Sequence, residues 1–111
     1  MSDCIFCKIA NGDIETEIKH RDDDVIAFAD INPQAPLHML IVPKKHIKNV
    51  NEAEDGILGR CVCVAKELAA KMGIADDGYR VVINCNGHGG QEVDHLHIHL
   101  LGGRQMKWPP G

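Results

Sequence analysis

Histidine and aliphatic residues alternate in the stretch His95-Leu96-His97-Ile98-His99-Leu100-Leu101. A period of two is that of a β-strand, so a strand over residues 94–101 is expected to carry all three imidazoles on one face and the aliphatic side chains on the other, in the core. Alternate residues on a strand lie roughly 6.5 to 7 Å apart, so the three rings can converge on one small group. A metal-binding or merely polar strand face would show the same alternation, although burying three uncompensated imidazoles is costly.

Apolar and turn-forming residues predict four further strands in the rest of the chain. Together with the histidine strand they make a sheet of five mainly antiparallel strands. The four cover residues 17–21, 25–30, 38–43 and 79–85.

Two helices complete the predicted α+β fold. A short one covers residues 4–10 after an N-cap at Ser2-Asp3. A long one covers residues 51–72, with Asn51 as its cap and Gly73 as its stop. The long helix carries an apolar stripe that is expected to cover the sheet. Its members are Ile57, Cys61, Val64, Ala65, Leu68 and Met72.

Length and charge narrow the class of protein. The chain has 111 residues, which predicts a single domain over residues 1–111. A net charge of −4, with no Lys/Arg cluster interleaved with aromatic residues, argues against a nucleic-acid partner. No apolar run is long enough to span a membrane, and the N-terminus lacks the features of a signal peptide. We therefore expect a cytoplasmic protein with no membrane partner.

Five cysteines are an odd number, which makes a disulfide scaffold an unfavoured reading and indicates a reducing compartment. Cys4 and Cys7 form a CxxC pair, whose sulfurs lie one helical turn apart. Such a pair fits redox chemistry or half of a tetrahedral zinc site. Thioredoxin-like chemistry would need a preceding strand, so structural zinc is favoured, while reduced thiols packed as small hydrophobic groups and a disulfide remain alternatives.

The histidine stretch matches in full the pattern His-φ-His-φ-His-φ-φ, where φ is hydrophobic, and in this the chain resembles the histidine triad nucleotide hydrolases and transferases. Three more blocks resemble the Hint branch of that family, the purine nucleoside phosphoramidases. The resemblance runs from Cys4 to Gly111, and four blocks in this order are far more specific than the triad alone. The three blocks are Asp30-Ile31-Asn32-Pro33-Gln34-Ala35-Pro36-Leu37-His38, Pro43-Lys44-Lys45-His46-Ile47 and Leu101-Gly102-Gly103-Arg104-Gln105-Met106-Lys107-Trp108-Pro109-Pro110-Gly111.

The resemblance implies catalysis by four histidines. His97 would be the nucleophile that attacks the α-phosphorus of a purine nucleoside phosphoramidate, because an unprotonated imidazole is available near neutral pH. His95 and His99 would orient it and stabilise phosphoryl charge, and His38 would add a fourth imidazole. The nucleotidyl-histidine would then be hydrolysed to the nucleoside monophosphate. No catalytic metal or organic cofactor is expected.

The resemblance also implies ligands for structural zinc and for the nucleotide. Zinc would be held by Cys4, Cys7, His46 and His95. Asp30 would bind the ribose hydroxyls, Asn84 the ribose or leaving group, and Gln91 with the backbone near Gly90 the phosphate. The purine, as in AMP or GMP, would lie among Phe6, Ile14, Phe28 and Ile31, although each of these apolar positions also fits ordinary core. Trp108, the last implied nucleotide-binding residue, lies in a tail that in the resembled branch reaches across a dimer interface towards the partner's active site, so we expect a homodimer.

Glu92 departs from the resembled pattern, which commonly has Ser at this position, and Asp94 stands where an uncharged residue is usual. A carboxylate beside a phosphate repels it, so Glu92 either turns away, is protonated or acts as the leaving-group acid. We expect it to turn away.

Three alternatives remain open on the sequence. A dinucleoside polyphosphate hydrolase or nucleotidyl transferase would use the same His97 with another leaving group. A non-catalytic nucleotide-binding or scaffold protein would keep the pocket without turnover. A zinc enzyme could bind catalytic metal on the three triad imidazoles, but it would leave Cys4 and Cys7 unused.

Overall fold

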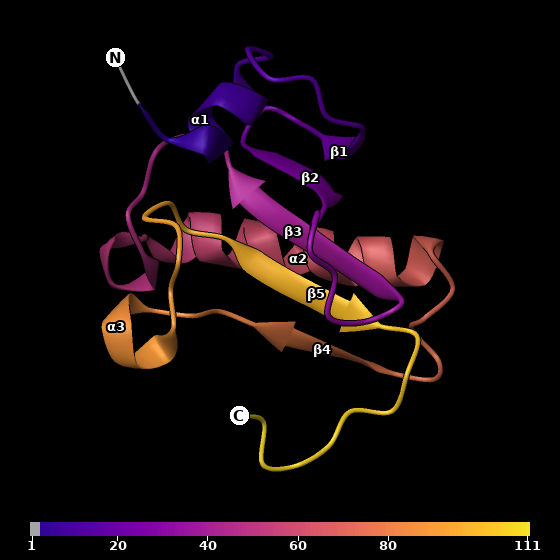
Figure 1. The fold of residues 1–111 in the computed structure, drawn as a ribbon. Coiled ribbons are helices and arrows are strands. Elements are labelled where there is room, and N and C mark those ends of the chain that lie inside the picture. Colours follow the sequence, from indigo (N-terminus) through magenta and orange to yellow (C-terminus); the bar gives the residue numbers. More distant parts are fainter. Residues whose placement is uncertain (1–2) are drawn as a thin grey trace.

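The computed structural model describes residues 3–111 and contains a five-stranded sheet of order β1-β2-β3-β5-β4 (Figure 1). Each neighbouring pair of strands is antiparallel, which confirms the predicted fold class. The strands are β1 (Ile18–Arg21), β2 (Val25–Ala29), β3 (Leu37–Pro43), β4 (Tyr79–Val82) and β5 (Ile98–Gly102).

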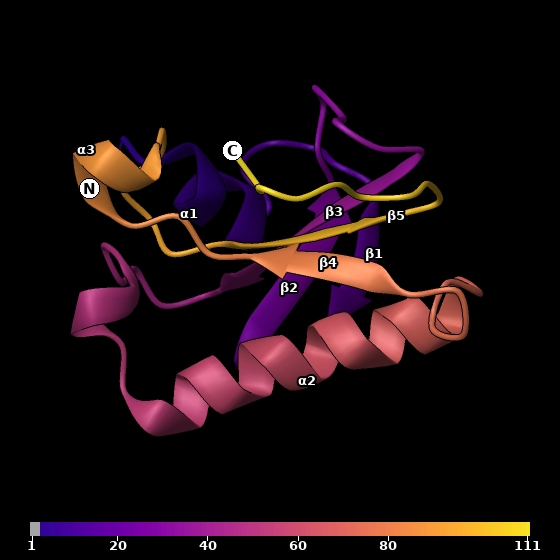
Figure 2. The same ribbon diagram turned by 90° about the horizontal axis from the view of Figure 1, so that it is seen from below.

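Helices lie on both faces of this sheet. The long helix α2 runs along one face, and the short helix α1 lies on the other (Figure 2). The helical elements are α1 (Ile5–Ala10), the 3-10 turn η1 (Val50–Glu52), α2 (Asp55–Lys71) and α3 (Asn86–Gly89).

Strands β2 and β3 are buried on both faces and separate two apolar clusters. Alternate residues of each strand point to opposite faces, so Val25 and Ile41 join the α2 cluster while Ile26 and Val42 join the α1 cluster. The predicted α2 stripe is confirmed, because its members pack in or against the first cluster. Leu96, Ile98 and Leu100 belong to that cluster too. These three side chains therefore anchor the histidine segment on the sheet face that packs against α2.

The prediction that the histidine strand begins near residue 94 is wrong, because β5 begins only at Ile98. The β3–β5 register ends at Ile41 opposite Ile98, and two residues further Pro43 would face Leu96. A proline has no N–H to donate to a ladder, so pairing ends there. Instead, the Leu96 N–H donates to the Ile47 carbonyl at 2.6 Å. His95 and His97 thus lie on the segment that precedes the strand.

Other predicted boundaries also shift. The long helix begins at Asp55, with Glu54 as its N-cap, so the predicted cap Asn51 is wrong. The helix does not start earlier because Ala53, which follows η1, has an extended backbone. Gly73 follows the end of α2 with φ +77°, as the predicted stop requires. Strand β4 ends at Val82 rather than at residue 85, and the glycine loop contains α3. Cys4 caps α1; the predicted cap residue Ser2 lies outside the described residues.

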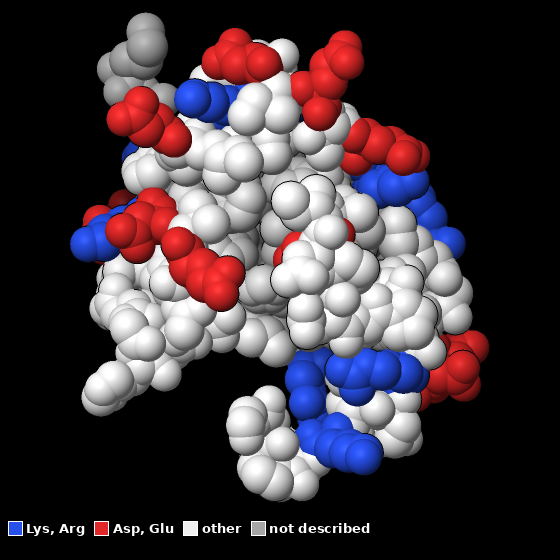
Figure 3. All heavy atoms as spheres, in the orientation of Figure 1, with Lys and Arg blue, Asp and Glu red and all other residues white. Residues whose placement is uncertain are grey.

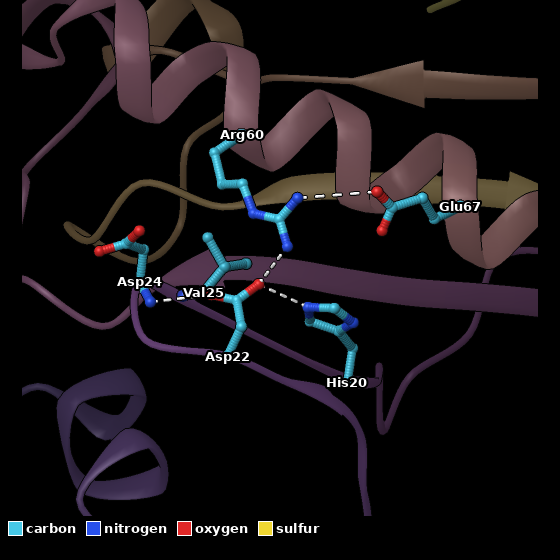
Figure 4. Close-up of polar contacts among 6 residues, drawn as sticks. All are labelled: His20, Asp22, Asp24, Val25, Arg60 and Glu67. Carbon is cyan, nitrogen blue, oxygen red and sulfur yellow. Dashed lines mark hydrogen bonds and ion pairs between the residues drawn. The ribbon is translucent and has the colours of Figure 1, made fainter.

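An ion pair fastens α2 to the turn between β1 and β2 (Figure 4). Arg60 donates to the Asp22 carboxylate at 2.6 Å and lies 3.6 Å from Glu67. Burial raises the pKa of Asp22, but hydrogen bonds from His20, the Asp24 N–H and Arg60 outweigh it and hold that pKa well below the ordinary value. The carboxylate therefore stays ionised, and the helix keeps its place against the sheet.

Within residues 3–111, no helix is long and apolar enough to cross a membrane. On the face opposite α2, Lys and Arg side chains lie at the edges (Figure 3).

Candidate active site

A hollow of about 380 Å³ lies where β3, β5 and the segment before β5 meet the loops at residues 30–36 and 84–92. It brings together six of the predicted site residues, which are Asp30, His38, Asn84, Gly90, His97 and His99. Three further residues line it: Asn32, Gln34 and Glu92.

His97 is buried and held in one tautomer. Its Nδ1 lies 2.7 Å from the His95 carbonyl oxygen, which can only accept, so Nδ1 carries the proton. The Nε2 lone pair is left free for attack on an electrophile. The Phe6 ring meets the imidazole edge to face, with centroids 5.1 Å apart, which fixes its orientation further.

His38 and His99 form a hydrogen-bonded pair with an assigned direction. The Gln34 N–H donates to His38 Nδ1 at 3.0 Å, so the proton of neutral His38 is on Nε2. That Nε2 lies 2.9 Å from His99 Nδ1 and donates to it, which places the His99 proton on its own Nε2. His99 Nε2 is buried and has no hydrogen-bond partner among residues 3–111. It is therefore a donor without an acceptor among these residues, on a ring that lines the hollow.

Burial keeps this pair neutral. It lowers the pKa of His99 to about 4, with help from His97 and His38. Burial also lowers the pKa of His38, and this effect is larger than the opposite effect of the negative charge of Asp30, which raises that pKa. Both rings are therefore uncharged near neutral pH, and they act on a ligand as dipoles rather than as cations.

His95 faces away from the hollow and towards the two cysteines. Its Nε2 donates to the Pro43 carbonyl at 2.8 Å, so Nδ1 presents a lone pair, 3.2 Å from Cys4 Sγ and 3.5 Å from Cys7 Sγ. His46 Nδ1 lies 3.3 Å from Cys7 Sγ. Tetrahedral zinc with ordinary Zn–S and Zn–N bonds puts S and N about 3.6 Å apart. The donor set and the tautomer of His95 both fit a zinc ion.

Asp30, His38 and His99 also lie within reach of one metal ion. The Gln34 N–H, however, keeps the proton on His38 Nε2, which is 3.4 Å from Asp30 Oδ2 and 2.9 Å from His99 Nδ1. That proton occupies the place between the three ligand atoms. The three side chains of this second group are therefore arranged around a hydrogen bond donated by His38 Nε2.

The predicted purine-binding residues are not gathered in one place. Phe6 and Phe28 are buried in the α1 cluster, with ring centroids 5.7 Å apart. Ile14 lines a separate hollow of about 520 Å³ beside α1 and β1, which contains no imidazole. Ile31 is 99% exposed and Trp108 is 81% exposed. The aromatic pair supports the nucleophile, while the exposed residues are free to meet a ligand or a partner.

Gln91 braces the loop at residues 84–92 rather than facing the hollow. Its Oε1 accepts from the Asn86 N–H at 2.9 Å, and its Nε2 donates to the carbonyls of Lys48 at 2.8 Å and Val93 at 2.9 Å. Gly90, one residue earlier, does line the hollow and adopts φ +75°, a conformation that favours glycine. The side chain of Gln91 therefore holds in place the backbone that reaches the site.

Glu92 is an exposed residue that lines the hollow, and its expected turn away from the phosphate stays a prediction. Gln34 was missed altogether as a site residue. Its only signal in the sequence is its position in a proline-bounded crossing four residues before His38, where a free backbone N–H is available to a nearby acceptor.

The family model described as HIT domain matches residues 11–106. The purine nucleoside phosphoramidase of Escherichia coli (strain K12) is 50% identical over 105 residues, covering 92% of this chain and 88% of that protein. A HIT family hydrolase from Legionella pneumophila Philadelphia 1 superposes with a TM-score of 0.95 at 52% identity, covering 98% of this chain and 100% of that one. A histidine triad protein from Clostridium difficile gives 0.92 at 44% identity, covering 96% of each chain.

Proposed function

The chain is a hydrolase of the HIT domain family, and from that premise we propose that it cleaves the P–N bond of purine nucleoside 5'-phosphoramidates through a nucleotidyl intermediate on His97. The observation that carries the proposal is the tautomer of His97. Because Nδ1 donates to the His95 carbonyl, an unprotonated Nε2 is available at the hollow without any prior proton transfer.

The reaction has two displacements. In the first, the Nε2 lone pair of His97 attacks the α-phosphorus, the P–N bond breaks with its electron pair going to nitrogen, and the amine departs after taking up a proton from solvent. In the second, water attacks the same phosphorus and gives a proton to solvent, the bond from phosphorus to Nε2 breaks with its electron pair returning to Nε2, and the nucleoside monophosphate leaves. The His99 Nε2–H donates to a phosphoryl oxygen as charge develops on it in both steps.

Other residues of the hollow bind the nucleotide. Asp30 and Asn84 both line the hollow, which supports a role for Asp30 in accepting hydrogen bonds from the ribose hydroxyls and for Asn84 in contacting the ribose or the leaving group. The backbone at Gly90 approaches the phosphate without a side chain in the way. The Glu92 carboxylate repels phosphoryl oxygens, so it favours a pose in which the departing amine, rather than the phosphate, lies beside it.

Zinc has a structural role in this proposal. Cys4, Cys7, His46 and His95 would hold the ion, whose chemistry is to cross-link the N-terminus to the nucleophile segment. His95 is the link, because its ring faces the cysteines while its carbonyl accepts a hydrogen bond from His97 Nδ1. Fixing His95 therefore also fixes the nucleophile.

Turnover tests the proposal directly. The wild-type protein is mixed separately with adenosine 5'-phosphoramidate and with diadenosine tetraphosphate, and nucleotide release is followed by chromatography. We expect AMP from the phosphoramidate at a much higher kcat/KM than any product from the dinucleotide. The reverse preference would indicate a polyphosphate hydrolase, and tight AMP binding with no turnover of either compound would indicate a nucleotide-binding protein.

We also propose that the protein is a homodimer. Strand β4 lies at the edge of the sheet, and its Tyr79 and Val81 are exposed apolar residues on that edge. An unprotected edge strand favours pairing with a second copy, which would make the two sheets continuous. The exposed Trp108 lies in a tail able to contact that copy. Sedimentation at micromolar concentration is expected to give twice the chain mass, and a monomer would contradict this proposal.

A further inference from the structure

Arg104 follows β5 by two residues and contacts a loop that precedes it by 70 positions in the chain. Its guanidinium donates two hydrogen bonds to the Gln34 carbonyl, from Nε at 3.3 Å and from Nη2 at 3.0 Å. When two N–H groups of a planar guanidinium donate to one carbonyl oxygen, both the position and the orientation of that carbonyl are fixed.

The residue before Arg104 packs against the same loop. Gly103 has φ +89°, and a Cβ there would lie 2.9 Å from the Pro36 Cβ. Figure 1 shows the C-terminal segment leaving β5 beside the turn that leads into β3. Gly103 and Arg104 together form a clamp on the loop at residues 32–36.

Two local hydrogen bonds hold the first part of that loop: the Asn32 N–H donates to Asp30 Oδ1 at 2.8 Å, and Gln34 Nε2 donates to the Asn32 carbonyl at 3.0 Å. Pro33 and Pro36 have no N–H, so neither can tie the crossing to the sheet. The Gln34 N–H is used at His38 Nδ1, at 3.0 Å. Gln34 therefore joins two contacts: its carbonyl accepts from Arg104, and its N–H sets the tautomer of His38.

We propose that Arg104 is a positioning residue for the reaction, acting through Gln34 on the tautomers of His38 and His99. With Gln34 fixed, the His38 proton stays on Nε2 and donates to His99, which keeps its own proton on Nε2 for the phosphoryl group. Without the clamp, the Gln34 N–H leaves His38 Nδ1, and either ring nitrogen then carries the proton. The catalytic consequence rests on the proposed function, but the effect on tautomers does not.

The test compares Arg104→Ala and Arg104→Lys with Arg80→Ala. Arg80 is a matched control, because its Nη2 donates to the Lys107 carbonyl at 2.9 Å. It therefore contacts the same tail through a bond that does not involve Gln34. We expect Arg104→Ala to lower kcat about tenfold with little change in KM, as for loss of a residue that orients a catalytic imidazole. Arg104→Lys is expected to recover part of this loss, and Arg80→Ala to leave kcat unchanged.

Nitrogen-15 NMR of the histidine rings supplies a readout independent of activity. In the wild type, Nδ1 of His38 and of His99 should be unprotonated and both Nε2 atoms protonated. In Arg104→Ala both rings should move towards a mixture of tautomers. Unchanged ring shifts in Arg104→Ala, or the same change in Arg80→Ala, would overturn the inference. If the wild type turns over no substrate, the proposed function fails, while the ring shifts still decide whether the clamp exists.

Discussion

His97→Ala is expected to abolish phosphoramidate turnover, with a loss in kcat of roughly 10⁴-fold or more, as for the removal of other catalytic nucleophiles. The reason is geometric. Among the imidazoles that line the hollow, His97 has its lone pair on Nε2, whereas His38 and His99 carry protons on theirs. Neither neighbour can replace the nucleophile without first losing a proton to another group.

The covalent intermediate makes this prediction specific. Wild-type protein is mixed briefly with adenosine phosphoramidate and quenched at alkaline pH, where a phosphoimidazole survives, and the chain is analysed by mass spectrometry. An adenylyl adduct should map to His97 and be absent from His97→Ala. His88→Ala is the control, because His88 lies exposed in α3 and does not line the hollow. An adduct on another residue, or turnover retained by His97→Ala, would contradict the mechanism.

Nucleotide affinity separates loss of chemistry from loss of fold. The His97 ring also packs against Phe6, so His97→Asn is a second variant that keeps more of the side chain than alanine. It is expected to bind AMP and to show no turnover. Loss of AMP binding by both variants would mean that His97 holds the pocket together rather than attacking the phosphorus.

Local patterns predicted the elements that bear the site. The alternation around His95, His97 and His99 and the apolar stripe of α2 follow from the periods of strand and helix, which are properties of neighbouring residues. The start of β5 did not follow from them, because it depends on which residue of β3 comes opposite. That residue is Pro43, and the register that aligns it with Leu96 is set by the pairing of distant segments.

Hydrogen bonds between distant segments were likewise beyond a local pattern. Arg104 reaches Gln34 across 70 positions, and both are ordinary polar residues in the sequence. The direction of the protons on His38 and His99 depends on that loop, so it could be assigned only once Gln34 was placed. The position of Glu92 at the hollow was beyond a local pattern for a related reason: it depends on the contacts of its neighbour Gln91 with Lys48 and Asn86.

The double variant Cys4→Ser/Cys7→Ser is expected to lose bound zinc and about 2 kcal/mol of stability, which lowers Tm by roughly 10 °C. The proposed zinc would join α1 to the segment before β5, whereas the apolar contacts of Phe6 and Ile9 hold α1 on the sheet without it. The loss is therefore partial. Metal content after growth and purification without chelators, together with calorimetry, measures both effects. Cys63→Ser is the control, because Cys63 is an exposed residue of α2 away from the cluster.

Chelation then distinguishes structural from catalytic zinc. A metal that activates the substrate would make turnover cease when it is removed. Here the nucleophile and its neighbour His99 line the hollow, whereas the four proposed zinc ligands do not, so the chelated protein should still form the adduct on His97, at a rate reduced by the freer motion of His95. If chelation stops adduct formation completely while the far-ultraviolet circular dichroism spectrum and AMP binding stay unchanged, zinc takes part in the chemistry. If the wild type binds no zinc with the ion in excess, the four residues instead pack as thiols and imidazoles.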